Sequence, residues 1–171
     1  MTRRLNIDSV ARIISDAGGE VVGRTKLQKL TYLLEAAGLG EGFSFEYKHY
    51  GPYSEELTYT SKRASVLGTI RESEQQAAWG GFYTIYSVTP IAPPRSEPHR
   101  RLAREAAHAD SVLLELAATA LFLRQEEGMV DAWEETARRK PDKASNGRLD
   151  AAKQLYSQLR QIPTPRQLPE L

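Results

Sequence analysis

The amino-acid sequence predicts an α+β protein that is mostly α. In the first half, two segments have the capping residues and apolar spacing of helix starts: GRTKLQKLTYLLE at 23–35 and YGPYSEEL at 50–57. A segment with strand-like alternation of aromatic residues joins them. The second half is rich in alanine, with apolar residues at helical spacing. The chain therefore combines a mixed first half with a helical second half.

The 171-residue chain is long enough to bury a substantial core, either as one domain or as one domain with an appended helical segment. Its formal net charge of +1 predicts no strong overall attraction to nucleic acid or to a membrane. The absence of cysteine excludes a disulfide and a thiolate nucleophile. The sequence also lacks a long apolar run, so we expect a soluble, cytoplasmic protein without membrane contact.

The first predicted helix runs from about Asp8 to Ala17, where apolar residues recur at helical spacing and a Gly-Gly pair follows. We expect the second helix to begin at Thr25. Its side chain is a good N-cap, and Gln28 three residues later completes the T-x-x-Q form of a capping box. Leucines then recur on one face until Gly38, a natural stop for a helix.

The segment FSFEYKHYG, residues 43–51, alternates aromatic rings with small or charged side chains. This period of two predicts a strand. A turn is expected at Gly51-Pro52. The third helix then covers about Ser54 to Leu67, because Ser54 can cap it, two glutamates occupy its first turn and a glycine follows it.

Two further extended segments, residues 70–76 and 82–88, flank the sequence AAWGG, and Gly80-Gly81 is a suitable hairpin turn. The second segment is rich in aromatic residues, whereas the first is polar. The predicted order helix–helix–strand–helix–hairpin contains the parts of a winged helix. The first 90 residues are therefore predicted to form a winged-helix-like part.

The third predicted helix is poorly charged for reading DNA. Glu55 and Glu56 lie at the end that would approach phosphates, and only Lys62 and Arg63 oppose them. A strand also separates this helix from the one before it, whereas the two helices of an ordinary helix-turn-helix follow each other closely. We therefore expect a winged-helix-like shape without DNA reading by its third helix.

The second half of the chain is predicted to be helical and begins after a linker punctuated by prolines. A long amphipathic helix, broken near residues 109–111, extends to Glu127, and Gly128 stops it. Two shorter helices are expected at about 130–139 and 148–161.

This pattern divides the chain into three parts. Residues 1–90 form the winged-helix-like part, and residues 91–162 form a helical segment that packs on it. Residues 163–171, which contain three prolines, are expected to form a disordered tail.

The two helix-start motifs resemble two related groups of proteins. GRTKLQKLTYLLE followed by YGPYSEEL is similar to the pattern of the YwgA-like family of uncharacterised bacterial and archaeal proteins. It also resembles the Panacea domain of SocA- and GepA-like antitoxins, which carries a similar K-L-Q-K-L-x-Y and a later G-P turn. The later segment LFLRQEEG…WEETARRKP, residues 121–141, looks like the YwgA-like pattern too. A Panacea-type antitoxin neutralises the toxin with which it is paired, so the resemblance implies a partner-binding role.

Two sets of residues are candidates for partner binding. A basic cluster lies at the start of the second predicted helix, where free N–H groups already favour anions. An aromatic set follows the predicted strand and turn, and tyrosine is enriched in binding sites. The plainer alternatives are a solvated helix face and rings packed between strand and helices. The candidates are Arg24, Lys26, Lys29, Tyr47, His49, Tyr50 and Tyr53.

A competing hypothesis is nucleic-acid binding through the hairpin and clusters of basic residues. Basic side chains gather at the linker, at the start of the long helix and around Pro141, and they form one patch if the fold brings them together. The alternative is an ordinary solvated, arginine-rich surface. The candidates are Lys62, Arg63, Arg95, Arg100, Arg101, Arg104, Arg138, Arg139 and Lys140.

No motif in the sequence indicates an enzyme. The histidines at 49, 99 and 108 share no ligand spacing and have no cysteine nearby, so no metal site is expected. No G-x-S-x-G surrounds a serine. The glycine-rich residues 38–42 lack the Lys-Ser/Thr of a phosphate loop and precede a strand rather than a helix. We therefore expect no catalytic residue and no cofactor.

The leading hypothesis is a non-enzymatic interaction module that binds and restrains or adapts a protein partner. This partner is a toxin or a subunit of a defence or regulatory assembly. The alternative is a winged-helix transcriptional regulator that binds nucleic acid, with an affinity that falls steeply as salt rises. The sequence leaves open the partner's identity, the choice between DNA and RNA, the oligomeric state and any small ligand.

Overall fold

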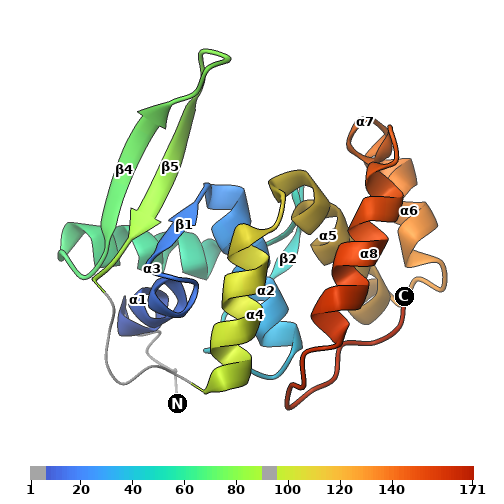
Figure 1. The fold of residues 1–171 in the computed structure, drawn as a ribbon, viewed down its shortest axis with the longest axis horizontal. Helices are drawn as coiled ribbons and strands as arrows, with labels where there is room; N and C mark the ends of the chain where they lie inside the picture. The colour runs from blue at the N-terminus through green and yellow to red at the C-terminus, as the bar shows by residue number, and fades with distance from the viewer. Residues whose placement is uncertain (1–6, 90–95) are drawn as a thin grey trace.

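The computed structural model describes residues 7–89 and 96–171, and Figure 1 shows how they are arranged. The fold is α+β and mostly helical, as predicted. The helices are α1 (Ile7–Asp16), α2 (Arg24–Ala36), α3 (Glu55–Val66), α4 (Glu97–His108), α5 (Ser111–Glu127), α6 (Ala132–Arg139), α7 (Pro141–Ala144) and α8 (Arg148–Arg160). The strands are β1 (Glu20–Val22), β2 (Glu46–Lys48), β3 (Gly51–Tyr53), β4 (Arg71–Gln76) and β5 (Phe82–Ser87).

The larger sheet is antiparallel and has the order β1-β5-β4. Strands β4 and β5 pair along their whole length, from Arg71 opposite Ser87 to Gln76 opposite Phe82. Strand β1 pairs with only the inner half of β5. As a result, the outer half of the β4–β5 hairpin extends beyond the helical body (Figure 1).

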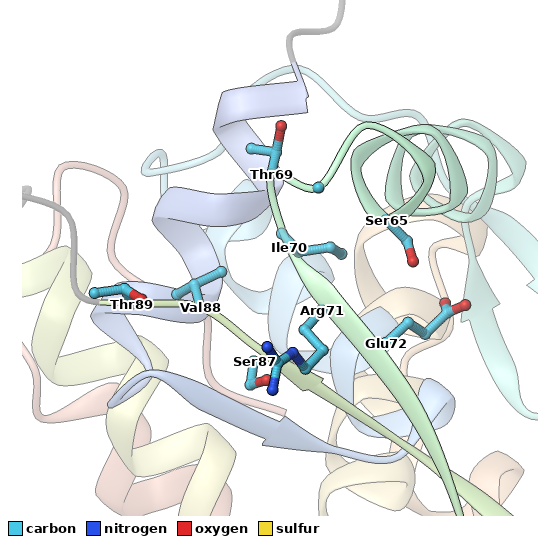
Figure 2. Close-up of a pocket in the computed structure, with 9 residues that line it drawn as sticks. Ser65, Thr69, Ile70, Arg71, Glu72, Ser87, Val88 and Thr89 are labelled. Atoms are coloured by element: carbon cyan, nitrogen blue, oxygen red, sulfur yellow. The ribbon is translucent and has the colours of Figure 1, made fainter.

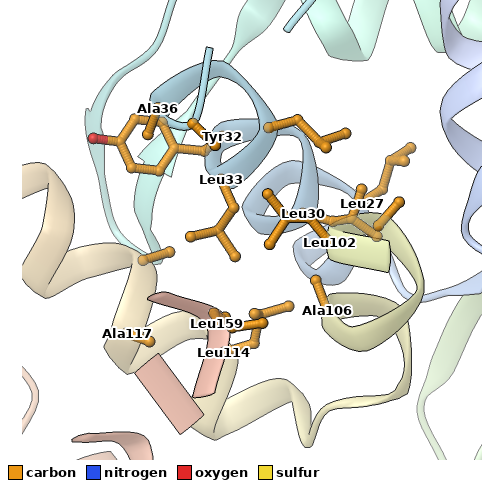
Figure 3. Packing of buried hydrophobic residues seen from close by; sticks show 14 of the residues in the cluster. Leu27, Leu30, Tyr32, Leu33, Ala36, Leu102, Ala106, Leu114, Ala117 and Leu159 are labelled. Atoms are coloured by element: carbon orange, nitrogen blue, oxygen red, sulfur yellow. The ribbon is translucent and has the colours of Figure 1, made fainter. Parts of the chain in front are cut away.

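The core is centred on α2, whose apolar face carries Leu27, Leu30 and Leu33. Helices α4 and α5 pack on it, and both come from the second half of the chain. Figure 3 shows the α2 leucines opposite apolar side chains of the later helices, among them Leu102 and Leu114. The two halves therefore share one core rather than forming two.

The predicted capping box at Thr25 is wrong. Helix α2 begins at Arg24, its N-cap is Gly23, and no side chain caps it. Gln28 points instead to Ser54, where its amide bonds two backbone groups at once. The predicted cap at Ser54 is confirmed, because the Leu57 N–H donates to Ser54 Oγ at 3.1 Å.

The predicted strand at 43–51 is shorter than expected, and its turn lies elsewhere. Only Glu46–Lys48 is extended, and it pairs with Gly51–Tyr53, so Gly51-Pro52 lies within a strand rather than in a turn. Gly51 has φ 89°, and a Cβ there would collide with Thr119 Oγ1 of α5. Glycine is thus required because this strand runs against a helix from the other half.

Other elements follow the sequence closely. The two hairpin strands, the break between α4 and α5 and the end of α5 at Gly128, in the left-handed region with φ 67°, are confirmed. Most of the predicted linker, residues 90–95, lies outside the described residues. Pro98 lies in the first turn of α4, where its missing N–H costs nothing.

The tail at 163–171 is packed, so the expected disorder is wrong. Leu168 is 1% exposed. The hydroxyl of Tyr156 donates to the Pro169 carbonyl at 2.6 Å, and Arg166 N–H donates to the Ala37 carbonyl at 2.9 Å. The prolines break helical structure, but one buried leucine and these bonds hold the segment against α8 and the end of α2.

Replacing Leu168 with alanine tests the packing of this tail. Removal of a buried leucine side chain is expected to lower the free energy of unfolding by about 2–4 kcal/mol. Urea unfolding of the wild type and the variant provides the measurement. Arg166→Ala, which alters an exposed side chain and keeps the backbone N–H, is the control. An unchanged unfolding midpoint for Leu168→Ala contradicts the packing.

Candidate partner-binding site

The basic residues at the start of α2 are used inside the molecule. Arg24 Nε donates to Thr84 Oγ1 of β5 at 3.2 Å. Lys26 Nζ donates to the carbonyls at the end of α4, at 2.6 Å for Ala109. Lys29, only 1% exposed, donates to the Pro52 carbonyl at 2.7 Å. The prediction of a basic contact surface is therefore wrong for Lys29, whereas Arg24 keeps an exposed side chain.

The two sequence motifs bind each other. Gln28 Nε2 donates to the Ser54 carbonyl at 3.0 Å, and the Ser54 N–H donates to Gln28 Oε1 at 2.8 Å. One residue later, Lys29 holds the Pro52 carbonyl. The side chains of KLQKL thus provide partners for the buried Ser54 N–H and Pro52 carbonyl of YGPYS. Sequence reasoning recognised both motifs but not this pairing.

A buried polar cluster lies beneath the β2–β3 hairpin. Glu115 Oε2 of α5 accepts from Lys143 Nζ at 2.7 Å and lies 3.4 Å from Lys140 Nζ. Lys140 also donates to the His49 carbonyl at 3.0 Å. Together with Lys29, three lysines surround one carboxylate, and burial lowers the pKa of Lys29 to about 7.

This cluster was not predicted from the sequence. Glu115 stands alone in the apolar run SVLLELAATALFL, and a lone carboxylate in such a run is the signal that could have revealed it. Lys140 was a candidate for nucleic-acid binding. It is buried, and burial lowers its pKa, so it belongs to this internal cluster instead.

The aromatic candidates divide into packed and exposed rings. The Tyr47 and Phe122 ring centroids lie 6.1 Å apart. The Arg139 guanidinium lies 4.8 Å from the centroid of the Tyr47 ring. Tyr50 is 56% exposed beneath the Lys143 ammonium, at 4.7 Å. The hydroxyl of Tyr53 lies 2.7 Å from Thr58 Oγ1.

Three of the four aromatic candidates therefore remain at the surface. Tyr50 and His49 are exposed and Tyr53 is half-buried, whereas Tyr47 packs against the core. His49 also contributes its backbone carbonyl to the cluster below it.

Most basic candidates for nucleic-acid binding are paired with acidic side chains. Lys62 lies 3.5 Å from Glu72, and Arg101 lies 3.2 Å from Glu105. Arg138 and Arg139 share Glu135 and hold the pKa of that carboxyl down to about 2. Arg63 lies over the Tyr59 ring, Arg100 and Arg104 are on α4, and Arg95 lies outside the described residues. The candidates come from three separate helices and their positive charge is largely compensated.

Large exposed apolar side chains lie almost entirely in the first half of the described residues. They are on the two hairpins, on β1 and on or just after α3, and Val130 is the exception. Exposed apolar side chains that adjoin one another are candidates for an interaction surface. The large exposed apolar residues of the first half are Val22, Tyr50, Tyr59, Val66, Leu67, Trp79, Phe82 and Tyr83.

A polar depression lies where α3 meets the inner end of the β4–β5 hairpin (Figure 2). Its volume is about 770 Å³, and four of its nine lining residues carry a hydroxyl group. Arg71 and Glu72 are its charged side chains. The lining includes no histidine and a single carboxylate.

The glycine-rich loop at 38–42 binds an anion that belongs to the protein itself. Glu35 Oε1 accepts from the backbone N–H groups of Glu41, Gly42 and Phe43 at 2.9, 2.8 and 2.9 Å. A Cβ at Gly40 would collide with this carboxylate. The position that a phosphate occupies in other glycine-rich loops is thus filled by Glu35.

Within residues 7–89 and 96–171, no group of three His, Asp or Glu side chains is placed to hold a metal ion. His99 is buried with its Nδ1 2.6 Å from Asp16 Oδ2, a contact that joins α1 to α4. No helix in this part of the chain is both long and apolar enough to cross a membrane.

Comparison with known proteins finds partial matches. Over 79 residues the chain is 35% identical to the uncharacterized protein YwgA of Bacillus subtilis strain 168, and the match covers 46% of each chain. Over 45 residues it is 44% identical to a DNA ADP-ribosyl glycohydrolase of Thermus aquaticus, covering 26% of this chain and 12% of that protein. No family model and no solved structure matches.

The chain therefore spans about half the length of YwgA and a small part of the glycohydrolase. The first match supports the resemblance to YwgA-like proteins that the motifs predicted. The resemblance to Panacea-type antitoxins stays a prediction.

The buried Lys29 predicts that stability depends on pH. In the folded protein its pKa is about 7, against an ordinary value of 10.5, so the unfolded chain binds more protons between these two values. The free energy of unfolding should therefore rise from about pH 7 to pH 10, by up to roughly 1.4 kcal/mol per pH unit from this residue.

Replacing Lys29 with methionine should remove this part of the slope. Urea unfolding of the wild type and Lys29→Met at several values between pH 6 and pH 9 provides the measurement. Lys153→Met, at an exposed position of α8, is the matched control. Equal slopes for the wild type and Lys29→Met would show that Lys29 keeps an ordinary pKa in the folded protein.

Proposed function

We propose that this protein is a non-enzymatic interaction module that binds and restrains or adapts a protein partner, in the manner of Panacea-type antitoxins. The partner would be a toxin or a subunit of a defence or regulatory assembly. The observation that carries the proposal is the exposure of large aromatic and aliphatic side chains on the hairpins and on or just after α3. Such residues bury well against another protein and are costly to expose otherwise.

The use of polar groups inside the molecule supports a binding rather than a catalytic role. Glu115 accepts a hydrogen bond from Lys143. Lys29 and Lys140 donate to backbone carbonyls. Glu35 accepts from the backbone N–H groups of the glycine-rich loop. These charged groups are thus engaged in holding the fold. At the surface, several large aromatic rings are exposed.

The sheet order β1-β5-β4, with α1, α2 and α3 beside it, supports a winged-helix-like description of the first part. In this description α3 and the β4–β5 hairpin form the contact surface. Glu55 and Glu56 begin α3, and Glu72 neutralises Lys62, so this surface favours a protein over a phosphate backbone.

One of the partial matches lends support to a module that works within larger systems. The segment similar to the Thermus aquaticus protein makes up 12% of that protein, which is named a DNA ADP-ribosyl glycohydrolase. A similar segment in a much longer chain supports a part that is combined with other parts. The competing function is a nucleic-acid-binding regulator. It is supported by the word DNA in the name of the Thermus aquaticus protein and by the winged-helix-like order of elements.

Co-purification separates these two functions. The tagged protein is recovered from its native host at moderate salt, with nuclease added to half of the sample. A stoichiometric protein companion that survives nuclease supports the proposal, and its identity tells a toxin from an assembly subunit. Nucleic acid without a protein companion, lost steeply as salt rises, would favour the regulator.

Tyr53→Ala should weaken binding of the recovered partner by about 1–2 kcal/mol, as expected for an aromatic contact residue. The fold should be retained, because Tyr53 is only half-buried. Isothermal titration with the purified partner provides the affinity. Tyr53→Phe, which keeps the ring and loses the bond to Thr58, is the control, and undiminished affinity of Tyr53→Ala would remove this residue from the contact surface.

A further inference from the structure

The outer part of the β4–β5 hairpin, residues 74–83, is here called the arm. Strand β1 supports β5 only from Ile85 to Ser87. The last ties to the body are at Thr84, where its carbonyl accepts from Gly23 N–H at 2.7 Å and its hydroxyl accepts from Arg24 Nε. Beyond that point two strands continue into solvent (Figure 1).

The tip of the arm has a defined structure. Ala77 N–H donates to the Gly81 carbonyl at 2.7 Å, and Gly80 N–H donates to the Ala77 carbonyl at 2.9 Å. Gly80 has φ 92°, which favours glycine. The Trp79 ring lies against Gly81 so closely that a Cβ there would collide with it. The indole is therefore held in place on the turn while 79% of the residue remains exposed.

Aromatic side chains surround the tip instead of lying on one face. Phe82 and Tyr83 are consecutive in a strand, so their side chains project from opposite faces. Phe82 is 65% exposed, and Trp79 lies beyond the end of the strand. A surface that is apolar on both faces and at its end cannot be covered by docking one face on a flat partner. It is covered only by insertion into a concave site.

The charge of the hairpin indicates which class of macromolecule it contacts. The β4–β5 hairpin has one arginine, Arg71, at its inner end, where Glu72 pairs with Lys62. The arm itself, residues 74–83, contains no lysine or arginine, and Glu74 is its charged residue. Hairpins that insert apolar side chains into a nucleic-acid groove need nearby cations to offset the phosphates. The arm supplies no such cation, and the Glu74 carboxylate would be repelled by phosphates. This charge favours a protein as the occupant of the contact.

We propose that the arm inserts its tip into an apolar pocket of the partner protein, with Trp79 as the anchor and Phe82 and Tyr83 against the two walls. The pocket must be roughly 10 Å across to accept two strands with side chains on both faces. Its rim is neutral or basic, which complements Glu74. This inference rests on the proposed function and adds the place and the shape of the contact.

Tryptophan fluorescence reads this contact directly. The chain has two tryptophans, and Trp133→Phe leaves Trp79 as the sole one. When the purified partner is added, Trp79 emission should shift to shorter wavelength and its quenching by acrylamide should fall several-fold. If Trp133→Phe is poorly folded, the difference between the spectra of the wild type and Trp79→Phe gives the same signal. Unchanged quenching in the saturated complex overturns the insertion.

Affinity gives the second readout. Trp79→Ala should weaken binding about 30-fold or more, as for an anchor residue in a pocket. Trp79→Phe should retain much of the affinity. Gln75→Ala, an exposed polar position on the same arm, should change little. Because these side chains are exposed, the circular dichroism and unfolding of the variants should match the wild type.

The outcomes separate this inference from the function on which it rests. If a protein partner is recovered but Trp79→Ala binds it normally, the insertion is wrong and the interaction module stands. If nucleic acid alone shields Trp79, both are wrong. If Trp79 is shielded in the free protein and becomes exposed on dilution, the arm contacts a second copy, which also overturns insertion into a separate partner.

Discussion

The structure depends on a set of side-chain donors on α2 that are aimed at the backbone of other elements. Gln28 bonds both backbone groups of Ser54, Lys29 bonds the Pro52 carbonyl, and Lys26 bonds the end of α4. Each bond is made in a buried or half-buried place, where an unpaired polar group lowers stability. These bonds fix the β2–β3 hairpin and α4 against one helix, and they place the aromatic residues that follow.

Local features could be predicted from the sequence because they depend on neighbouring residues. The Ser54 cap, the hairpin strands and the stop at Gly128 all belong to this class. Features that depend on distant residues could not. The T-x-x-Q pattern at Thr25 resembled a local cap, yet Gln28 was drawn to a backbone 26 residues away. The tail had the composition of a disordered segment, yet Leu168 is buried.

The candidate site shows the same division. Sequence reasoning selected the correct motifs and gave Lys29 a surface role, because nothing in a basic helix start reveals which side chains turn inward. It identified Gly80-Gly81 as a turn but gave Trp79 no role. Only the register of β1 against β5 shows that this tip extends beyond the body. The role of an exposed tryptophan can therefore be inferred only once its position in the fold is known.

The shared core constrains how this protein can be reused. Leu27, Leu30 and Leu33 of the first half face apolar side chains from α4 and α5 of the second (Figure 3). Separation of the two halves would leave each of them with an uncovered apolar surface. Each half therefore depends on the other to bury its apolar surface. The tip of the arm lies outside that core. Its side chains can therefore change, and new partner specificities can arise there, without loss of core packing.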